Sequence, residues 1–483
     1  MRILRNVVMA LSMVVSSVLT GGAAAQDTSD LGEPAITIKT NAYANLGEAN
    51  VFTILIGVTE QSEYYDIDMG FGPEEFEATY ATIDSEGLWH GSSIEARVSE
   101  KGEIKIYGDA SKIDVIKAIG CYITDIDLSK CENLDILVLE HNELKGLDLT
   151  PNTKLSAIYL SDNPGSEETP IIIGTPKPNL QILELDIIGW LDPNFRPDYP
   201  NLKMLDLYYT RRLKSIDLSG CPLLVNLVLE LTDVETLDLT PVPYLWHLNI
   251  SESRIREVDF TKVPKLSELF CSHTSGTVNT DVKIESLDLT GLPELTYLSA
   301  ASNNLKSLDI SKNPKLRTLY IRRNDLTALD ISANPNLASI DINLNRFTYS
   351  TLPADRTTFS EYFYGQKPYQ VDRSYGVETA IDFTCMLRPE SNTYVRVMSE
   401  PVGGTAEEVD LVAYTWENGM LTFNKTFADS VYVEFVNSEL SDYTLTSSRF
   451  MVKTADEFGK PSKIVSMMVP RNTEVRYKRC LCR

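Results

Sequence analysis

The sequence has few of the residues and motifs on which enzymes depend. It contains only four histidines, His90, His141, His247 and His273, and these are scattered along the chain. It contains no GxSxG, HExxH or phosphate-loop motif, and no cysteine and histidine are spaced as a nucleophile pair. We therefore predict that the protein is not an enzyme, holds no metal and needs no cofactor.

Positive charge and long apolar runs are also scarce. Lys and Arg total 44 against 68 Asp and Glu, and the net charge of −24 would repel a phosphate backbone, which excludes nucleic acid as a partner. After the first 25 residues no segment approaches ~20 unbroken apolar residues, so we expect no integral membrane segment in the mature chain. Seven cysteines in 483 residues are too few for a disulfide scaffold.

The first 25 residues have the layout of a secretory signal. Arg2 and Arg5 precede an apolar run from Val7 to Leu19, and three alanines, residues 23–25, come directly before Gln26. This order of charged, apolar and small residues predicts cleavage after residue 25. We therefore expect a protein that is secreted or held at the outer cell surface.

A tetrad of an apolar residue, Asp, an apolar residue and Ser or Thr recurs along the middle of the chain, most often 21 residues apart. Between its copies runs the pattern L-x-x-L-x-L-x-x-(N/T/S)-x-L, which is clearest from Leu316 to Leu326. Each L-x-L portion predicts one short strand per turn, and stacked turns form a parallel sheet over a leucine core. The tetrad aspartates are Asp127, Asp148, Asp217, Asp238, Asp259, Asp288, Asp309 and Asp330.

The sequence thus predicts a leucine-rich-repeat solenoid of the α/β class, mostly β, with about 11 coils of ~21 residues. The coils depart from the template at 162–179 and at 273–283. The first apolar positions of the coils are Ile113, Leu134, Leu155, Leu180, Leu202, Leu224, Leu245, Leu266, Leu295, Leu316 and Leu337.

Polar residues recur in the coils at fixed places. The tetrad aspartates favour turns in which the carboxylate accepts backbone N–H bonds, and a calcium ladder is the weaker alternative. Four cysteines, Cys121, Cys131, Cys221 and Cys271, fall on inward positions and are interpreted as buried packing residues. Asparagines that follow the strand predict a ladder of side-chain amides bound to backbone groups, namely Asn142, Asn163, Asn303, Asn324 and Asn345.

Short β runs flank the repeat on both sides. Residues 34–112 predict an N-terminal β module that caps the first coil of the repeat domain, 113–352. A Tyr-rich connector, 353–375, leads to residues 376–453, where the Asn418-Gly419 pair is a hairpin signal within an Ig-like β-sandwich. The last segment, 454–483, is basic and is interpreted as a tail or a sorting segment.

The stretch Leu308-Asp309-Ile310-Ser311-Lys312-Asn313-Pro314-Lys315-Leu316 and its neighbours resemble the internalin-like leucine-rich-repeat proteins of bacterial surfaces, in particular the 21-residue, internalin J-like class. The resemblance implies an exported adhesin that acts in attachment, cell-cell contact or biofilm formation, with a protein or cell-surface receptor as its partner. The chain departs from that class in lacking a sortase-type LPxTG signal and in retaining few cysteines of its ladder.

The variable strand residues are expected on the concave side, where aromatics interleaved with carboxylates favour protein recognition. His247 and Glu268 share a position in successive coils and predict a surface pair rather than an acid-base dyad. Two alternatives stay open: a structural surface or matrix component that self-associates, and a secreted enzyme. The predicted contact residues are Tyr159, Glu184, Asp206, Tyr208, Glu230, His247, Phe270, Tyr297 and Tyr320.

Overall fold

The computed structural model describes residues 16–17, 31–47, 50–83, 89–191, 195–273, 282–354, 359–441 and 443–454. The chain forms two compact units, residues 1–271 with 276–282 (unit 1) and residues 272–275 with 283–483 (unit 2). Apart from β1 (Ser16–Ser17), the predicted signal segment lies outside the described residues, as does the basic tail beyond Thr454. Within those ranges, we find no helix with both the length and the apolar character to cross a bilayer.

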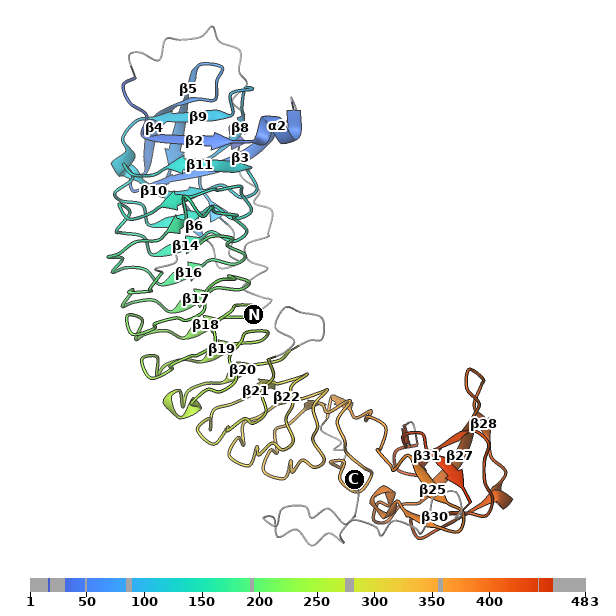
Figure 1. Ribbon diagram of the computed structural model, residues 1–483. Helices are drawn as coiled ribbons and strands as arrows, with labels where there is room; N and C mark the ends of the chain where they lie inside the picture. Colours follow the sequence, from blue (N-terminus) through green and yellow to red (C-terminus); the bar gives the residue numbers. More distant parts are fainter. Residues whose placement is uncertain are drawn as a thin grey trace. The chain divides into compact units, whose positions relative to one another are not determined.

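Unit 1 is built mainly of coils that each contribute one short strand to a parallel sheet (Figure 1). The strands run in register, so that Leu183 on one coil lies beside Leu205 on the next. The middle residue of each strand points inward, as Leu227 and Leu248 do, and is buried in the core. The parallel strands of unit 1 are β10 (Ile113–Lys117), β12 (Ile136–Val138), β14 (Ala157–Tyr159), β16 (Ile182–Glu184), β17 (Met204–Asp206), β18 (Asn226–Val228), β19 (His247–Asn249) and β20 (Glu268–Phe270).

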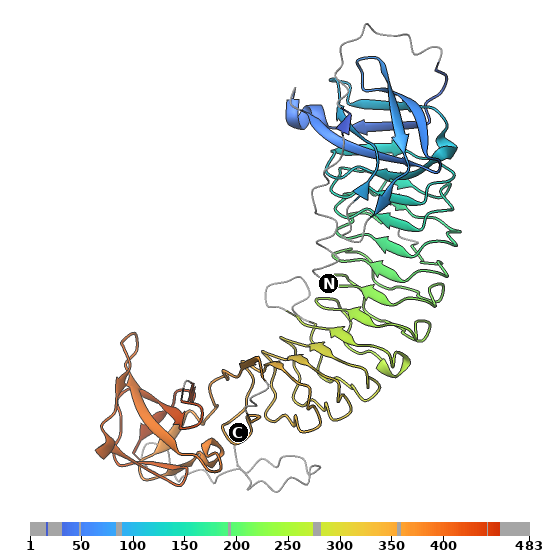
Figure 2. The ribbon, with the colours of Figure 1, turned by 180° about the vertical axis from the view of Figure 1, so that it is seen from behind.

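Unit 2 begins with the same kind of coil. Its parallel strands are β21 (Tyr297–Ser299), β22 (Thr318–Tyr320), β23 (Ser339–Asp341) and β24 (Glu361–Phe363). Together the two units contain the eleven predicted strands, and this confirms the leucine-rich-repeat solenoid. The short strands of the successive coils are seen from behind in Figure 2. The structure adds β24 inside the segment expected as a connector, where it pairs in parallel with β23.

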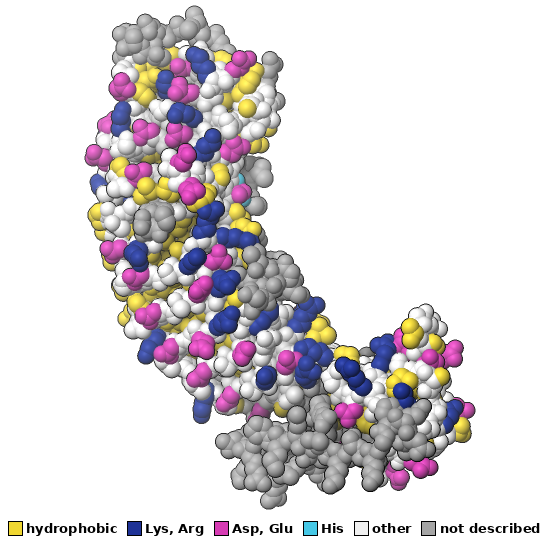
Figure 3. All heavy atoms as spheres, viewed as in Figure 1, with side chains coloured by type: hydrophobic (Ala, Val, Ile, Leu, Met, Phe, Trp, Pro, Cys, Tyr) yellow, Lys and Arg dark blue, Asp and Glu magenta, His cyan; other side chains and the backbone are white. Residues whose placement is uncertain are grey.

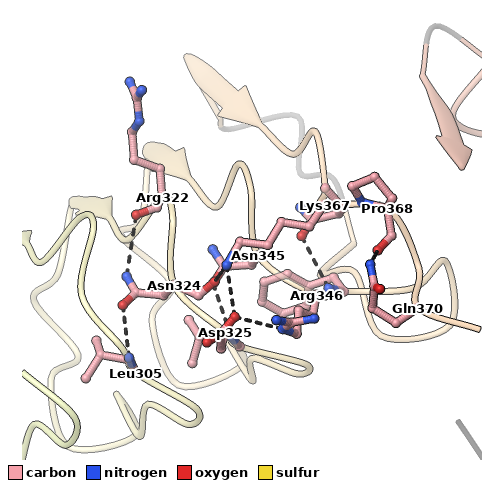
Figure 4. A network of polar contacts seen from close by, with 12 residues as sticks. Leu305, Arg322, Asn324, Asp325, Asn345, Arg346, Lys367, Pro368 and Gln370 are labelled. Carbon is pink, nitrogen blue, oxygen red and sulfur yellow. Dashed lines mark hydrogen bonds and ion pairs between the residues drawn. The ribbon is translucent and has the colours of Figure 1, made fainter. Parts of the chain in front are cut away.

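The asparagine ladder is confirmed in both units, and Figure 4 shows part of it. The buried Asn324 side chain donates to the Ala300 and Ile321 carbonyl oxygens at 2.9 and 3.0 Å and accepts from the Leu305 amide at 3.0 Å. These bonds satisfy backbone groups that the bend after each strand leaves without ladder partners. In the added coil Gln366 takes the place of asparagine and donates to the Ile342 carbonyl oxygen at 3.1 Å.

A second column of inward-pointing residues lies at the turn on the opposite side of each coil. Residues of several types occupy it, and the polar ones hydrogen-bond to backbone carbonyl oxygens of that turn. Asn334 donates to two carbonyl oxygens of the preceding coil, those of Ile310 and Asn313, each at 2.9 Å. Cys131 and Cys221 take equivalent buried positions, and burial raises the pKa of their thiols to about 12 and about 11. The interpretation of these cysteines as quiet packing residues agrees with that burial.

The tetrad aspartates all form the predicted turn. In each, a side-chain oxygen accepts from the backbone N–H two residues on, as Asp309 does from Ser311 at 2.9 Å. These hydrogen bonds hold the pKa of the Asp309 carboxyl below its usual value. The same bond occurs at Asp127, Asp148, Asp217, Asp238, Asp259, Asp288 and Asp330.

Antiparallel strands precede the first coil in unit 1. β3 pairs antiparallel with β10, so the exposed backbone edge of the first coil is covered by hydrogen bonds rather than left open. The strands of this module are β2 (Ile36–Thr40), β3 (Val51–Val58), β4 (Ser62–Asp68), β5 (Pro73–Thr79), β8 (Ser93–Arg97) and β9 (Glu103–Tyr107), and a pair β6 (Thr82–Ile83) and β7 (Trp89–His90) lies beside them. Smaller elements of unit 1 are α2 (Ala42–Leu46), η3 (Ala110–Lys112), β11 (Ile123–Asp127), β13 (Leu147–Asp148), β15 (Ile171–Ile172) and η4 (Phe260–Lys262).

Unit 2 ends in a small β-sandwich. One sheet has the order β26-β30-β29 and the other β28-β27-β31-β32, and Phe383 contacts Phe435 between them with ring centroids 4.9 Å apart. Asn418 and Gly419 both have positive φ, as the predicted hairpin turn requires. The elements are β25 (Ser374–Gly376), β26 (Ala380–Asp382), η5 (Thr384–Met386), β27 (Thr393–Glu400), β28 (Glu407–Glu408), η6 (Leu411–Ala413), β29 (Tyr414–Glu417), β30 (Met420–Phe423), β31 (Ser430–Asn437), β32 (Thr444–Thr446) and β33 (Met451–Lys453).

Candidate functional site

The outer face of the parallel sheet in unit 1 is formed by the first and third residues of each strand. Because the strands are in register, equivalent side chains form straight columns about 4.8 Å apart from coil to coil. One column passes through Tyr159, Glu184 and Asp206, and another through Asn226, His247 and Glu268. We call this surface the strand face of unit 1.

The predicted contact residues of unit 1 all lie on the strand face or directly after its strands, but they differ in burial. Tyr159, Glu184, Tyr208, Glu230 and Phe270 are half-buried. Asp206 is only 4% exposed and His247 only 1%, because neighbouring side chains one coil away cover them. These two therefore offer almost no surface to a partner.

His247 and Glu268 are in contact, as their spacing predicted. The His247 Nδ1 lies 2.8 Å from a Glu268 carboxylate oxygen, and the Phe270 ring lies 5.2 Å from the imidazole. The expectation of a surface pair is wrong for the histidine, since its ring is covered by the adjoining coils. Burial lowers the pKa of His247 below its usual value, against the opposing hydrogen bond and charge of Glu268.

Carboxylates gather where β16 and β17 end. Oxygen atoms of Glu184, Asp186 and Asp206 all lie within 4.8 Å of one another, and we call these three residues the acidic row. Tyr159 stands beside them in the register, and burial followed by the charges of Glu184 and Glu140 raises its pKa to about 12. The phenol therefore stays protonated next to the acids at any physiological pH.

The two predicted residues in unit 2 form a small aromatic pair. Tyr297 and Tyr320 meet edge to face with ring centroids 5.8 Å apart. The Tyr320 hydroxyl lies 3.1 Å from a Glu361 carboxylate oxygen, which also accepts from the Ser339 hydroxyl at 2.5 Å. Both rings are half-buried, because each packs on its neighbours along the sheet.

Four exposed apolar side chains in two successive coils of unit 1 were not among the predicted contact residues. Leu223, Val225, Tyr244 and Trp246 are 40%, 38%, 48% and 45% exposed, and we call them the apolar patch. They lie directly before β18 and β19, one residue before and one residue after the first buried leucine of each coil. That alternation around Leu224 and Leu245 is the signal by which the sequence could have revealed them.

The surroundings of the apolar patch are polar. The Lys265 ammonium lies over the Tyr244 ring, 4.6 Å from its centroid. The Lys203 side chain, in the coil before Val225, donates to the Gln181 amide oxygen at 2.8 Å. Figure 3 shows acidic and basic side chains interspersed with hydrophobic ones on the visible face of the described coils. An apolar centre with a polar rim is typical of protein interfaces.

No known protein-family profile matches the chain, and no curated protein does. Among solved structures, the functional domain of InlJ from Listeria monocytogenes matches with 18% identity over 74% of this chain and 94% of that one, at a TM-score of 0.36. Internalin C2 of the same species matches with 19% identity over 52% and 88%, at 0.30. The receptor kinase GASSHO1 ectodomain of Arabidopsis thaliana matches with 21% identity over 50% and 31%, at 0.37.

Two of these structures are internalins, and each is less than 25% identical to this chain. The fold itself is established by the coils of this chain: parallel strands in register, leucines buried at the middle of each strand, and asparagine amides bound to the bends that follow. The chain is therefore a leucine-rich-repeat solenoid protein, and in its repeats it resembles the internalins.

Proposed function

We propose that this protein is an exported protein-binding scaffold that acts at the outer cell surface in attachment, cell-cell contact or biofilm formation. The observation that carries the proposal is the apolar patch. Tyr244 and Trp246 in this patch are nearly half exposed. Such a cluster of large apolar side chains is uncommon on a surface without a partner, because contact of apolar side chains with water is unfavourable. Tyr and Trp are also the side chains that most often anchor interfaces.

The strand face beside the patch supports the same reading. Glu230 and Glu268 are both half-buried. The Glu230 carboxylate accepts from the Asn249 amide on the next coil at 2.7 Å, and the Glu268 carboxylate lies 2.8 Å from the His247 Nδ1 on the previous coil. Side chains held in place by the scaffold lose little conformational entropy on binding. The partner we expect is a protein or cell-surface receptor with apolar side chains at the centre of its contact surface.

Export rests on the first 25 residues, whose order of charged, apolar and small residues favours a secretory signal. A structural matrix component without a defined ligand is the second candidate, since an exposed apolar patch can also mediate self-association. A secreted enzyme is the least favoured candidate, because no nucleophile motif accompanies His247 and Glu268 in the sequence and burial raises the pKa of the Cys131 and Cys221 thiols to about 12 and about 11.

The double substitution Tyr244→Ser with Trp246→Ser is expected to weaken partner binding at least tenfold. Truncating a central aromatic anchor typically costs about 2 kcal/mol or more of binding free energy. The measurement is saturation binding of the labelled full chain to whole cells of the producing organism and to surfaces coated with extracellular matrix.

A matched control is Tyr64→Ser with Phe71→Ser, which removes two aromatics that are 59% and 49% exposed in the module before the coils. The control is expected to bind like the parent chain. Unchanged binding by the Tyr244 and Trp246 variant would contradict the proposed contact surface. Sedimentation that shows concentration-dependent assembly, with no saturable binding to cells or matrix, would favour the structural alternative.

A further inference from the structure

The acidic row places oxygen ligands from two adjacent coils around one point. Glu184 is the last residue of β16, Asp186 follows two residues later, and Asp206 lies beside Glu184 in the register of β17. Their carboxylate oxygens lie within 4.8 Å of one another. Asp186 is 7% exposed and Asp206 is 4% exposed, so most of this negative charge is removed from water.

Two further buried oxygen atoms continue the row. Ser161 and Glu140 occupy the position of Asp186 in the two preceding coils, as the bonds from Asp162 N to Asp186 O at 2.7 Å and from His141 N to Ser161 O at 2.8 Å show. Side chains at one position of a parallel register point to the same face. Ser161 and Glu140 are more than nine-tenths buried, and the Ser161 hydroxyl and one Glu140 carboxylate oxygen have no hydrogen-bond partner among the described residues.

A row of this kind is unfavourable without a compensating positive charge. Burial, followed by the neighbouring carboxylate of Asp186, raises the pKa of Asp206 well above its usual value. Burial likewise raises the pKa of Glu140, and the charge of Asp186 adds to that shift. Like charges in a poorly solvated place are stabilised either by taking up protons or by binding a cation.

We propose that the acidic row, with Ser161 beside it, binds a calcium ion. The donors are oxygens alone, which hard divalent cations prefer, and carboxylates dominate the set. Oxygens bound to one Ca²⁺ at 2.3–2.6 Å lie at most about 5.2 Å apart, which accommodates the observed spacing. Mg²⁺ would need its ligands within about 4.2 Å of one another in a strict octahedron, which oxygens spread along a sheet do not provide readily.

Calcium titration of the chelator-stripped full chain, followed by calorimetry, tests the proposal. We expect saturable binding of one Ca²⁺ per chain and a higher midpoint of thermal unfolding in millimolar CaCl2, with a smaller effect of MgCl2. Asp206→Asn is expected to weaken calcium binding at least tenfold. Glu184→Gln is expected to weaken it as well, and because Glu184 is partly exposed this second variant keeps the test decisive if Asp206→Asn does not fold.

Asp341→Asn is the matched control. Asp341 is the last residue of β23, and its carboxylate accepts from the Asn343 backbone N–H at 3.0 Å. The Asp206 carboxylate accepts in the same way from the Tyr208 backbone N–H at 2.9 Å. The register neighbours of Asp341, however, are Tyr320 and Phe363 rather than carboxylates. Its calcium affinity should equal that of the parent chain. Absence of calcium-dependent heat and stabilisation in the parent would overturn the proposal, as would parent-like affinity in both acidic-row variants or an equal loss in the control. Partner binding is tested by different residues, so either result stands alone.

Discussion

Asn324→Ala is expected to lower the free energy of unfolding by about 3 kcal/mol, because a buried backbone group that loses its partner costs about 1–3 kcal/mol. The Asn324 amide serves three such groups, the carbonyl oxygens of Ala300 and Ile321 and the amide of Leu305, and an alanine methyl can serve none of them. Water cannot replace the side chain there, since Asn324 is fully buried between coils. Urea unfolding followed by circular dichroism measures the loss.

The control for this prediction is Asn304→Ala, which removes the same side chain one coil earlier from an exposed position. Its effect should stay within about 0.5 kcal/mol. Asn324→Thr is expected to fall between the two, since Thr232 occupies the equivalent place in another coil and its hydroxyl donates one bond, to Leu229 O at 2.8 Å. A loss below about 1 kcal/mol in Asn324→Ala would show that the ladder does not carry the stability assigned to it.

In the parent chain, Lys177 is expected to raise the free energy of unfolding by about 3 kcal/mol between pH 8 and 10.5. Lys177→Met should abolish this pH-dependent rise. Lys177 is 1% exposed, and its ammonium donates to the carbonyl oxygens of Leu149 and Asn152 at 2.8 and 3.1 Å. It thereby takes the role that an asparagine amide has in the regular coils. Burial lowers its pKa from 10.5 to about 8, against an opposing effect of Asp148.

The sign follows from proton binding. Between pH 8 and 10.5 the unfolded chain keeps the proton of Lys177 while the folded chain has released it, so the free energy of unfolding increases with pH across this window. The contribution is fully present above pH 10.5 and is lost as pH falls through 8. The measurement is the difference in urea midpoint between parent and variant over this range, with the exposed Lys154→Met as control. A parallel pH dependence in parent and Lys177→Met would contradict the lowered pKa.

Much of the fold was accessible from the order of residues. Leucines spaced for one strand per turn predicted the eleven strands that the two units contain, because inward and outward positions alternate along any strand. The asparagine and aspartate positions were equally predictable, since their hydrogen bonds go to backbone groups at set distances in the same or the adjoining coil. Strand β24 escaped prediction because Tyr362 replaces the leucine and Gln366 the asparagine.

The candidate site was less accessible. The sequence located the strand face and its columns, and it paired His247 with Glu268. It did not distinguish covered side chains from exposed ones, so Asp206 and His247 were expected at the surface while Tyr244 and Trp246 were overlooked. Burial on the strand face depends on the size and orientation of residues one coil away, and those belong to a different part of the chain.

The sequence by itself determined the repeat, the inward leucines and the turns, because each depends on contacts within one coil or on a register repeated in all of them. Tertiary structure alone decided which carboxylates meet, which lysine is buried and which apolar side chains reach water. Stacking brings residues some 20 positions apart to within hydrogen-bonding distance, as with His247 and Glu268, and it sets the Glu184 and Asp206 carboxylates side by side. The charge, burial and pKa of each side chain therefore depend on neighbours that no single repeat contains.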